Sequence, residues 1–258
     1  MRAHLERGFA EQVEQPHPEG GAQGLGKPVC GRGDVTVETA ETPEATVSLE
    51  PLNGAAEKAL DDVTIEFSGD RLVVDHGSGA RLGLIMRSPS FRVAIRAPHD
   101  SALEVGTVSA DVRADGSFAS LDAKTVSGDL SIGDIARDAS VKSVSGEVKL
   151  RKVAGTVSVN TVSGDVKVTE AARGANVKTV SGDQSIDSIT EGSAQLQSVS
   201  GDIRVGIQQG SGVWFDVRST SGKTVSELEP AEGPAADCPS VELRAKAVSG
   251  DIRIVRAA

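Results

Sequence analysis

The sequence predicts an all-β protein, a parallel β-helix (β-solenoid) of about 18 residues per coil, with a β-rich N-terminal cap. Three observations predict this fold: a four-residue motif recurs at a nearly fixed spacing, apolar and polar residues alternate on both sides of the motif, and aromatic residues are scarce. We favour a right-handed coil because parallel crossover connections are generally right-handed. The same period also suits left-handed hexapeptide helices.

The recurring motif is Val-Ser-Gly-Asp or a close variant. Its copies begin at Val108, Val126, Val144, Val162, Val180, Val199, Thr220 and Val248. The spacings between the starts of successive copies are therefore 18, 18, 18, 18, 19, 21 and 28. A fixed period of about 20 residues is typical of a solenoid, in which each repeat buries its apolar face only by stacking on its neighbours.

The residues after each motif predict a strand with one face in a core. The fourth residue after the first Val is apolar in every copy except two, which have Gln184 and Thr224. The other copies have Val112, Leu130, Val148, Val166, Ile203 and Ile252. The sixth residue is also apolar in most copies, and the residue between them is polar. Alternation at period two is the pattern of a half-buried strand. Gln184 interrupts the apolar column, and we expect its amide to be satisfied or slightly exposed.

The residues before each motif predict a second strand. Apolar residues stand three and five positions before the first Val, and a hydroxyl column stands one position before it, formed by Thr107, Thr125, Ser143, Thr161, Thr179, Ser198 and Ser219. By alternation the hydroxyls face inward, where they can hydrogen-bond along the stack. Gly in the motif supplies the positive φ of a tight corner, and Asp or Ser can hydrogen-bond the turn backbone.

We divide the chain into a disordered tail (1–33), a β-rich N-terminal cap (34–100) and solenoid repeats (101–258) with a loop insertion at 224–240. The tail is polar and rich in Gly and Pro. Where the tail meets the cap, Arg32-Gly33-Asp34 spells the integrin-type tripeptide, which we interpret as a chance match beside a strand that opens at Asp34. The cap covers an end of the helix that would otherwise be an exposed sheet edge.

Within the cap, alternation predicts one hairpin from residues 34–39 and 45–50 and a second from 63–67 and 71–75. Residues 53–62 form the one short helical candidate, and 91–96 form the last strand before Pro98. Beside the insertion, Trp214 and Phe215 are expected to plug the end of the core. A ligand-stacking role for Trp214 is the alternative.

Composition limits the function. The net charge of −10 and the pI near 5.0 argue against binding to nucleic acid, whose phosphates require a basic face. The apolar run 82–86 is too short to span a membrane, and the stretch 1–22 lacks the apolar core of a signal peptide. We therefore expect a cytoplasmic protein, or a cell-surface one if the start or an export route has been missed. Cys30 and Cys238 are expected to be free thiols, with a disulfide as the alternative.

The acidic column is the strongest candidate for chemistry. It comprises Asp111, Asp129, Glu147, Asp165, Asp183, Asp202 and Asp251. Stacked carboxylates could recruit Ca²⁺, but the Gly-Gly-x-Gly-x-Asp pattern of calcium-binding rolls is missing. We interpret them as turn aspartates and assign no catalytic, cofactor-binding or metal-binding residue. The four histidines lie outside the repeats, and the sequence has no phosphate loop or nucleophile elbow, so we do not expect an enzyme.

The Val-Ser-Gly-Asp coils, preceded by a β-rich block, resemble the bacterial "putative-adhesin" family of β-strand repeat proteins, a domain of unknown function. The resemblance covers roughly residues 34–256 and includes the closing stretch from Val241 to Ile254. It implies a non-enzymatic β-helix and brings no catalytic or binding residues.

From these observations we predict a non-catalytic, acidic scaffold that binds another protein and uses no cofactor. The alternatives are an exported surface adhesin or carbohydrate-binding module and, third, a polysaccharide-acting β-helix enzyme. A regular polar face carrying Lys142, Lys178, Lys149 and Lys167 favours the scaffold.

Overall fold

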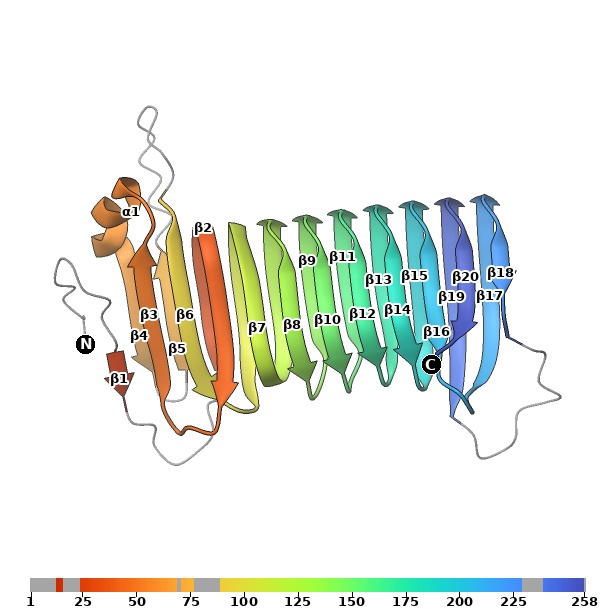
Figure 1. The fold of residues 1–258 in the computed structure, drawn as a ribbon, viewed down its shortest axis with the longest axis horizontal. Coiled ribbons are helices and arrows are strands. Elements are labelled where there is room, and N and C mark those ends of the chain that lie inside the picture. Colours follow the sequence, from red (N-terminus) through yellow and green to blue (C-terminus); the bar gives the residue numbers. More distant parts are fainter. Residues whose placement is uncertain (1–12, 16–23, 69–70, 77–88, 229–238, 258) are drawn as a thin grey trace. The chain divides into compact units, whose positions relative to one another are not determined.

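A computed structural model describes residues 13–15, 24–68, 71–76, 89–228 and 239–257 (Figure 1). The backbone forms two compact units, residues 1–133 and 134–258, and the boundary falls within β8 (Leu130–Ile135). Most of the chain is strand, as predicted, and the fold is a parallel β-solenoid. The tail 1–12 and 16–23 and the apolar run 82–86 lie outside the described residues.

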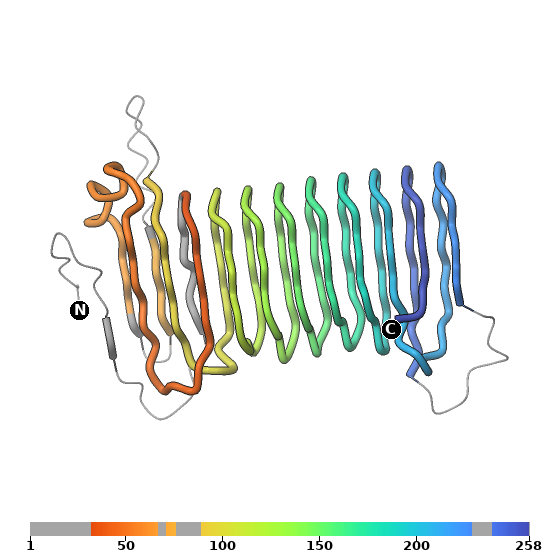
Figure 2. Tube along the Cα trace, in the orientation of Figure 1, coloured from red at the N-terminus to blue at the C-terminus, as the bar shows by residue number. Residues whose placement is uncertain are grey.

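Unit 2 is a stack of two-strand coils (Figure 2). The first strand of each coil leads into the Val-Ser-Gly-Asp corner, and these strands are β9 (Ala139–Ser145), β11 (Val157–Ser163), β13 (Gly174–Ser181), β15 (Gly192–Ser200), β17 (Gly212–Ser221) and β19 (Ser240–Ser249). The second strand leaves the corner, and these are β10 (Val148–Val153), β12 (Val166–Ala171), β14 (Gln184–Ile189), β16 (Ile203–Ile207), β18 (Thr224–Ser226) and β20 (Ile252–Arg256). Equivalent strands pair in parallel, for example β11 with β13 and β12 with β14.

The predicted inward columns form the core of unit 2. Val148, Val166 and Ile203 are aligned through the pairings of β10, β12, β14 and β16, and each is at most 1 % exposed. The hydroxyl column is buried as well. Thr179 Oγ1 lies 3.3 Å from Ser198 Oγ of the neighbouring coil, in hydrogen-bonding distance. The alternation of β-branched and polar residues therefore identified both the core and its polar ladder.

The coils of unit 2 do not stack in the order of the sequence. β19 pairs with β15 on one side and with β17 on the other, and β20 likewise lies between β16 and β18. In Figure 1 the last coil of the chain is accordingly inserted between the coil of β15–β16 and that of β17–β18. The predicted insertion 224–240 is the connection that makes this possible, although its first residues, Thr224–Ser226, form β18 and are not loop. Residues 229–238 lie outside the described part.

The corners of unit 2 continue the hydrogen bonding from coil to coil. The backbone N–H of Gly164 donates to the carbonyl of Ser181 at 3.0 Å. Gly164 has φ of 143°, and a Cβ at this position would collide with the carbonyl oxygen of Gly146. Glycine is therefore required at this corner both by its dihedral angle and by the close approach of the coil below.

Unit 1 contains the N-terminal strands and the first coil copies. Its elements are β1 (Val13–Gln15), β2 (Gly24–Ala40), β3 (Ala45–Pro51), α1 (Gly54–Ala59), the 3₁₀ turn η1 (Leu60–Asp62), β4 (Val63–Ser68), β5 (Arg71–His76), β6 (Phe91–Pro98) and β7 (Ser101–Ser127). The long β7 bends through the corner at Ala110 and Asp111. Thr107 Oγ1 donates to Thr125 Oγ1 at 3.0 Å, so the hydroxyl ladder is present in this unit too.

The helix, the second hairpin and the strand at 91–96 predicted for unit 1 are confirmed, and the first hairpin is wrong. The helix at 53–62 is present, and the Asn53 side chain caps it by accepting the N–H of Ala56 at 2.8 Å. β4 and β5 form the predicted antiparallel hairpin. Residues 34–39 and 45–50 do not pair, because β6 lies between them, parallel to β2 and antiparallel to β3. The alternate residues of β6 from Phe91 to Ala97 are all buried, as expected of a strand with one face in the core.

β2 is itself a coil of the solenoid, which the sequence did not reveal. Arg32, Gly33 and Asp34 align with Ser109, Ala110 and Asp111 of β7. The integrin-type tripeptide is therefore a degenerate copy of the Ser-Gly-Asp corner, with Gly33 at φ of 128°. Since β2 begins at Gly24, part of the stretch predicted as a disordered tail is strand.

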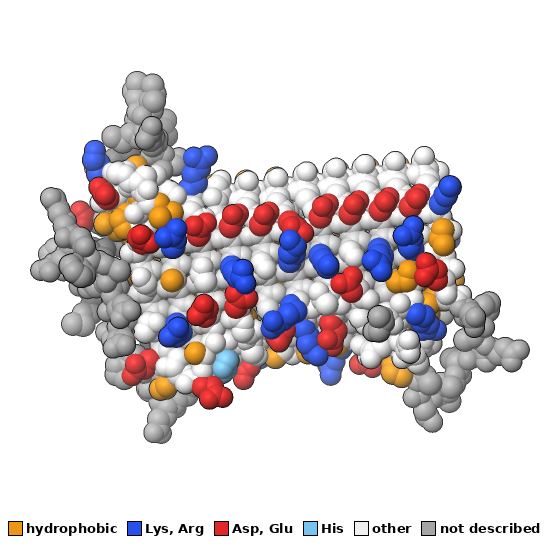
Figure 3. Space-filling model, viewed as in Figure 1, with side chains coloured by type: hydrophobic (Ala, Val, Ile, Leu, Met, Phe, Trp, Pro, Cys, Tyr) orange, Lys and Arg blue, Asp and Glu red, His pale blue; other side chains and the backbone are white. Residues whose placement is uncertain are grey.

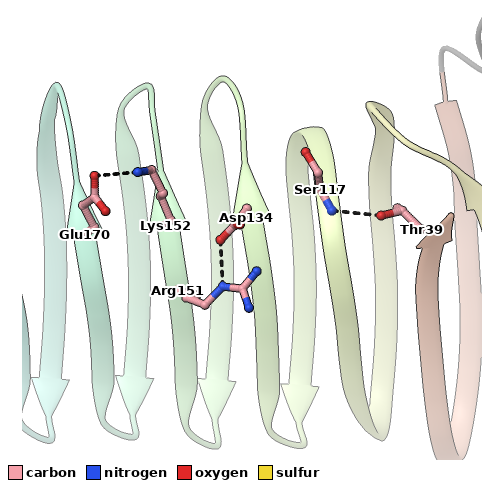
Figure 4. Close-up of polar contacts among 6 residues, drawn as sticks. All are labelled: Thr39, Ser117, Asp134, Arg151, Lys152 and Glu170. Atoms are coloured by element: carbon pink, nitrogen blue, oxygen red, sulfur yellow. Dashed lines mark hydrogen bonds and ion pairs between the residues drawn. The ribbon is translucent and has the colours of Figure 1, made fainter. Parts of the chain in front are cut away.

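Specific polar contacts also tie neighbouring strands together within each unit (Figure 4). In unit 1 the N–H of Ser117 donates to Thr39 Oγ1 at 2.8 Å. In unit 2, Arg151 Nε lies 2.7 Å from Asp134 Oδ1, and Lys152 Nζ lies 3.0 Å from Glu170 Oε1. These ion pairs are half exposed, so each contributes about 0–1 kcal/mol to the free energy of unfolding. The stack is held mainly by backbone hydrogen bonds and core packing.

Two valines of one coil provide a stringent test of the burial pattern. Val166→Asp would place an unpaired carboxylate in the stack, and we expect the free energy of unfolding to fall by about 3–5 kcal/mol. Val162→Asp is the matched control, because Val162 is half exposed and its change is expected to cost about 1 kcal/mol or less. Urea denaturation followed by circular dichroism measures both, and equal effects would contradict the assignment.

A second pair of variants tests the glycine corner. Gly164→Ala should lower the free energy of unfolding by about 2 kcal/mol or more, because it combines strain at positive φ with a backbone collision. Gly54→Ala is the control. A Cβ on Gly54 meets no atom within 4 Å, so this change should be neutral or slightly stabilising. A melting temperature unchanged by Gly164→Ala would be inconsistent with the corner geometry described here.

Candidate binding surface

One outward column of unit 2 is apolar. The first residue of each motif follows the inward hydroxyl column, so alternation turns it outward. We call the valines at this position the valine column: Val144, Val162, Val180, Val199 and Val248. Each is between 47 and 52 % exposed, whereas the inward valines of the same strands are almost completely buried. Because strands stack about 4.8 Å apart, the column is a continuous apolar stripe roughly 19 Å long.

Basic and neutral polar residues lie beside the valine column. Two positions before each valine stand the exposed residues Lys142, Asn160, Lys178, Gln197 and Lys246, which the strand register aligns. On the other side lies a serine column at the corner, formed by Ser145, Ser163, Ser181, Ser200 and Ser249. We call these three columns together the valine face.

The valine face differs in charge from the rest of this acidic chain. β9, β11, β13 and β15 contain no Asp or Glu. Among the described residues, Lys142, Lys178 and Lys246 take part in no ion pair. The one acidic side chain of β19, Glu242, is paired with Arg244. The lysine charges beside the valine column are therefore available to an external partner.

The opposite face of unit 2 carries charged side chains of both signs, and several of them form ion pairs. On the face of β10, β12, β14 and β16 a row of acidic side chains runs along the coils, and basic side chains lie beside it (Figure 3). Lys149 Nζ lies 2.6 Å from Glu147 Oε2, and Lys167 Nζ lies 3.9 Å from Asp187 Oδ2. The sequence grouped Lys149 and Lys167 with Lys142 and Lys178 on one polar face. The structure separates them onto two faces, and in the described part of unit 2 the unpaired lysines named above belong to the valine face.

The acidic column has a structural role in unit 2. The backbone N–H of Asp183 donates to the carboxylate of Asp165 at 2.8 Å, and the N–H of Asp202 donates to the carboxylate of Asp183 at the same distance. The series continues through Asp251, whose carboxylate accepts the N–H of Lys223 at 2.7 Å. In unit 1 the N–H of Asp129 donates to Asp111 at 2.9 Å. The carboxylates of Asp111, Asp165, Asp183, Asp202 and Asp251 thus each fix the corner of the neighbouring coil.

This arrangement supports the interpretation of these residues as turn aspartates. No group of three or more His, Cys, Asp or Glu side chains that could hold a metal ion occurs within the described ranges. One oxygen of each bonded carboxylate is already committed to a peptide N–H. The assignment of no catalytic, cofactor-binding or metal-binding residue stays a prediction.

The same series explains the identity of Lys223. It occupies the acidic position of the coil of β17 and β18, which lies outermost in unit 2. In the described part of the chain no further coil follows this one, so no N–H requires a carboxylate there. The change from Asp to Lys therefore marks the terminal coil.

Gln184 is buried, and its amide is partly satisfied. It is 1 % exposed, and Nε2 donates to Thr179 Oγ1 at 2.9 Å and to the carbonyl of Gln197 at 2.7 Å. The second of these bonds fixes the amide orientation, because a carbonyl only accepts. Oε1 receives no hydrogen bond from a described residue. The amide replaces an apolar side chain by bonding to the hydroxyl ladder.

Trp214 and Phe215 behave differently from each other. Phe215 aligns with the buried Leu243 and so continues a core column, as a plug would. Trp214 points outward, is 58 % exposed, and has the Arg244 guanidinium 5.9 Å from its ring centroid. The prediction that Trp214 plugs the core is therefore wrong. Alternation from Phe215 would have placed it outside.

Other sequence predictions are not tested by the described residues. Cys238 and the side chain of Cys30 lie outside the described residues, so their pairing stays open. None of the helices described here is both long and apolar enough to cross a membrane. The cytoplasmic location stays a prediction. In unit 1, the hydrogen bond that Arg113 Nε donates to the Asp115 carboxylate, and then the charge of Asp115, raise the pKa of the exposed Arg113.

The valine column was missed at the level of sequence, although its signal was present. These valines are the first residue of each motif copy. The inward hydroxyl column immediately before them already implied that they face outward. An apolar residue that recurs on the outside of successive coils is the feature that points to a binding surface.

The acidic column is tested by substitution and by calcium. Asp183→Ala removes the acceptor for the N–H of Asp202 and should lower the free energy of unfolding by about 1–2 kcal/mol. Asp187→Ala, on the same coil, is the control, since Asp187 has only a long ion pair and a long hydrogen bond. Millimolar Ca²⁺ should not shift the melting temperature of the unmodified protein, and a shift would indicate a metal ladder.

Comparisons with known proteins gave matches over most of the chain. A family model described as Toastrack DUF4097 matches residues 31–255. Among solved structures, the chain resembles a "putative adhesin" from Parabacteroides distasonis at 12 % identity, covering 96 % of this chain and 98 % of that one with a TM-score of 0.45. It also resembles a "putative adhesin" from Bacteroides fragilis (12 % identity, 95 and 97 % covered, TM-score 0.44) and a "putative cell adhesion protein" from Clostridium sporogenes (13 %, 96 and 100 %, 0.34). No curated protein matched.

Proposed function

The chain belongs to the Toastrack DUF4097 family, and we propose that it is a non-catalytic binding protein whose valine face binds another protein. The observation that carries this proposal is the combination, on one face of unit 2, of a continuous apolar stripe with lysines that have no partner among the described residues. A contiguous apolar stripe that is rimmed by polar side chains is typical of an interaction site, whereas apolar residues exposed singly are common on any protein surface.

The chemistry of the valine face indicates the kind of partner. Half-exposed valines offer apolar area without a cavity, so they suit a flat or extended surface. Lys142, Lys178 and Lys246 favour carboxylates beside the apolar contact. We therefore expect the partner to be a protein surface that places a row of apolar side chains beside a row of acidic ones.

The regular stack supports this proposal in a second way. The columns are fixed by the strand register, so the backbone and the Cβ positions of the valine face are set before a partner arrives. A surface ordered in advance loses little conformational entropy on binding. Rigid presentation of repeated side chains is the property that a scaffold needs.

Site-specific photo-crosslinking in the native host tests the proposal. A photoreactive phenylalanine analogue at Val180 should form adducts with a defined protein, whereas the same analogue at Ser185, on the opposite face of the same coil, should not. The adducts should be lost from a crosslinker at Val144 when Val162→Asp and Lys178→Glu are introduced together. Circular dichroism must show that this variant folds, as the exposure of both residues leads us to expect.

Several outcomes would contradict the proposal. Adducts of equal yield from both faces would mean that the valine face is not the binding surface. Adducts that survive Val162→Asp with Lys178→Glu would mean that its apolar and basic character is irrelevant. Crosslinking to carbohydrate alone would favour the alternative of a carbohydrate-binding module.

A further inference from the structure

The terminal coil of unit 2 leaves one strand edge open. Within the described residues β17 pairs with β19 alone, and β18 pairs with β20 alone. The other edge of β17 therefore presents backbone N–H and C=O groups that have no strand partner. An open edge of this length is a template for pairing with a further strand.

The core side of β17 is apolar and incompletely covered. Phe215 is 45 % exposed, although Leu243, its neighbour in the same column, is fully buried. Val217 is half-buried, while its neighbour Ala245 is fully buried. β18 differs, because Thr224 and Ser226 stand where Ile252 and Ile254 stand in the next coil. The apolar end of the core thus lies at β17.

The outward side of β17 has a self-complementary charge pattern. Asp216 and Arg218 flank Val217, and in the single chain Arg218 Nε contacts Asp216 Oδ1 at 3.0 Å. In an antiparallel pair of two β17 strands centred on Val217, Asp216 of each strand stands opposite Arg218 of the other. Opposite charges directly across an antiparallel ladder stabilise it, and this register produces the pair twice.

We propose that two copies of this protein associate through β17, which pairs antiparallel with β17 of the second copy about a twofold axis at Val217. The same surface serves both copies, as in an isologous dimer. Pairing satisfies the open peptide groups, brings Val217 against Val217 of the second copy, and covers Phe215. The proposal does not depend on the valine face or on its partner.

Sedimentation equilibrium from about 1 to 200 μM tests the association. The unmodified protein should form dimers with increasing concentration. Asp216→Arg and Arg218→Asp should each weaken association at least about tenfold, because like charges then oppose each other across the pair. The double variant D216R/R218D should recover the original dimerisation constant to within about threefold, because the pairs are restored with reversed polarity.

Mixing the two single variants gives an independent check of the register. D216R carries two arginines and R218D two aspartates at these positions, so an equimolar mixture should form heterodimers while each alone stays largely monomeric. Trp214 is the one tryptophan of the chain and lies on β17. Its fluorescence should therefore change with concentration in the unmodified protein and in the mixture, but not in either single variant.

Two results would overturn the proposal. One is a protein that stays monomeric throughout the concentration range. The other is a dimer whose association constant is unaffected by both charge reversals and by Val217→Lys, because that dimer would use another surface. Circular dichroism and melting temperature of each variant exclude misfolding as the cause of lost association. Asp216 and Arg218 face outward, so their variants are expected to fold.

Discussion

The corner between the two strands of each coil constrains everything else in unit 2. Gly164 adopts a positive φ and lies against the backbone of Gly146, so neighbouring corners approach more closely than any side chain would permit. The carboxylate beside this glycine then accepts a peptide N–H of the following coil, as Asp165 does from Asp183. Together these contacts fix both the spacing and the register of adjacent coils. A shift of one residue would break the carboxylate bond and turn every inward valine outward.

Fixed register converts a repeat in sequence into columns in space. The inward columns close the core, and the hydroxyl ladder runs beside them, with Gln184 accommodated by bonds to Thr179 and Gln197. The outward columns are equally regular, and their chemistry is divided between two faces. One face carries side chains of both charges, some of which form ion pairs, as Lys152 does with Glu170. The valine face has no acidic side chain on β9, β11, β13 or β15, and its lysines take part in no ion pair among the described residues.

The sequence predicted the period, the inward columns and the corner chemistry, because these depend on neighbours that lie one coil apart along the chain. It failed where the chain departs from sequential stacking. The spacings of 21 and 28, with Thr220 and Lys223 in a weak motif copy, were signs that this copy lies at an end, but they do not say that the last coil precedes it in space. The insertion of β6 between β2 and β3 was equally hidden, since alternation reports which face is buried and not which strand is the neighbour. Arg32-Gly33-Asp34 was overlooked as a corner because only Gly33 and Asp34 match the motif.

The inserted coil of β19 and β20 has a consequence for how unit 2 is made. A solenoid whose coils stack in chain order can grow as it leaves the ribosome, each coil settling on the one before. Here β17 and β18 emerge before the strands on which they rest. Their native pairing is possible only after residues 240–256 have been synthesised and have docked on β15 and β16. Unit 2 therefore cannot reach its native stack before β19 and β20 have been translated. A chain that ends before them would leave the edges of β15 and β16 without their native partners.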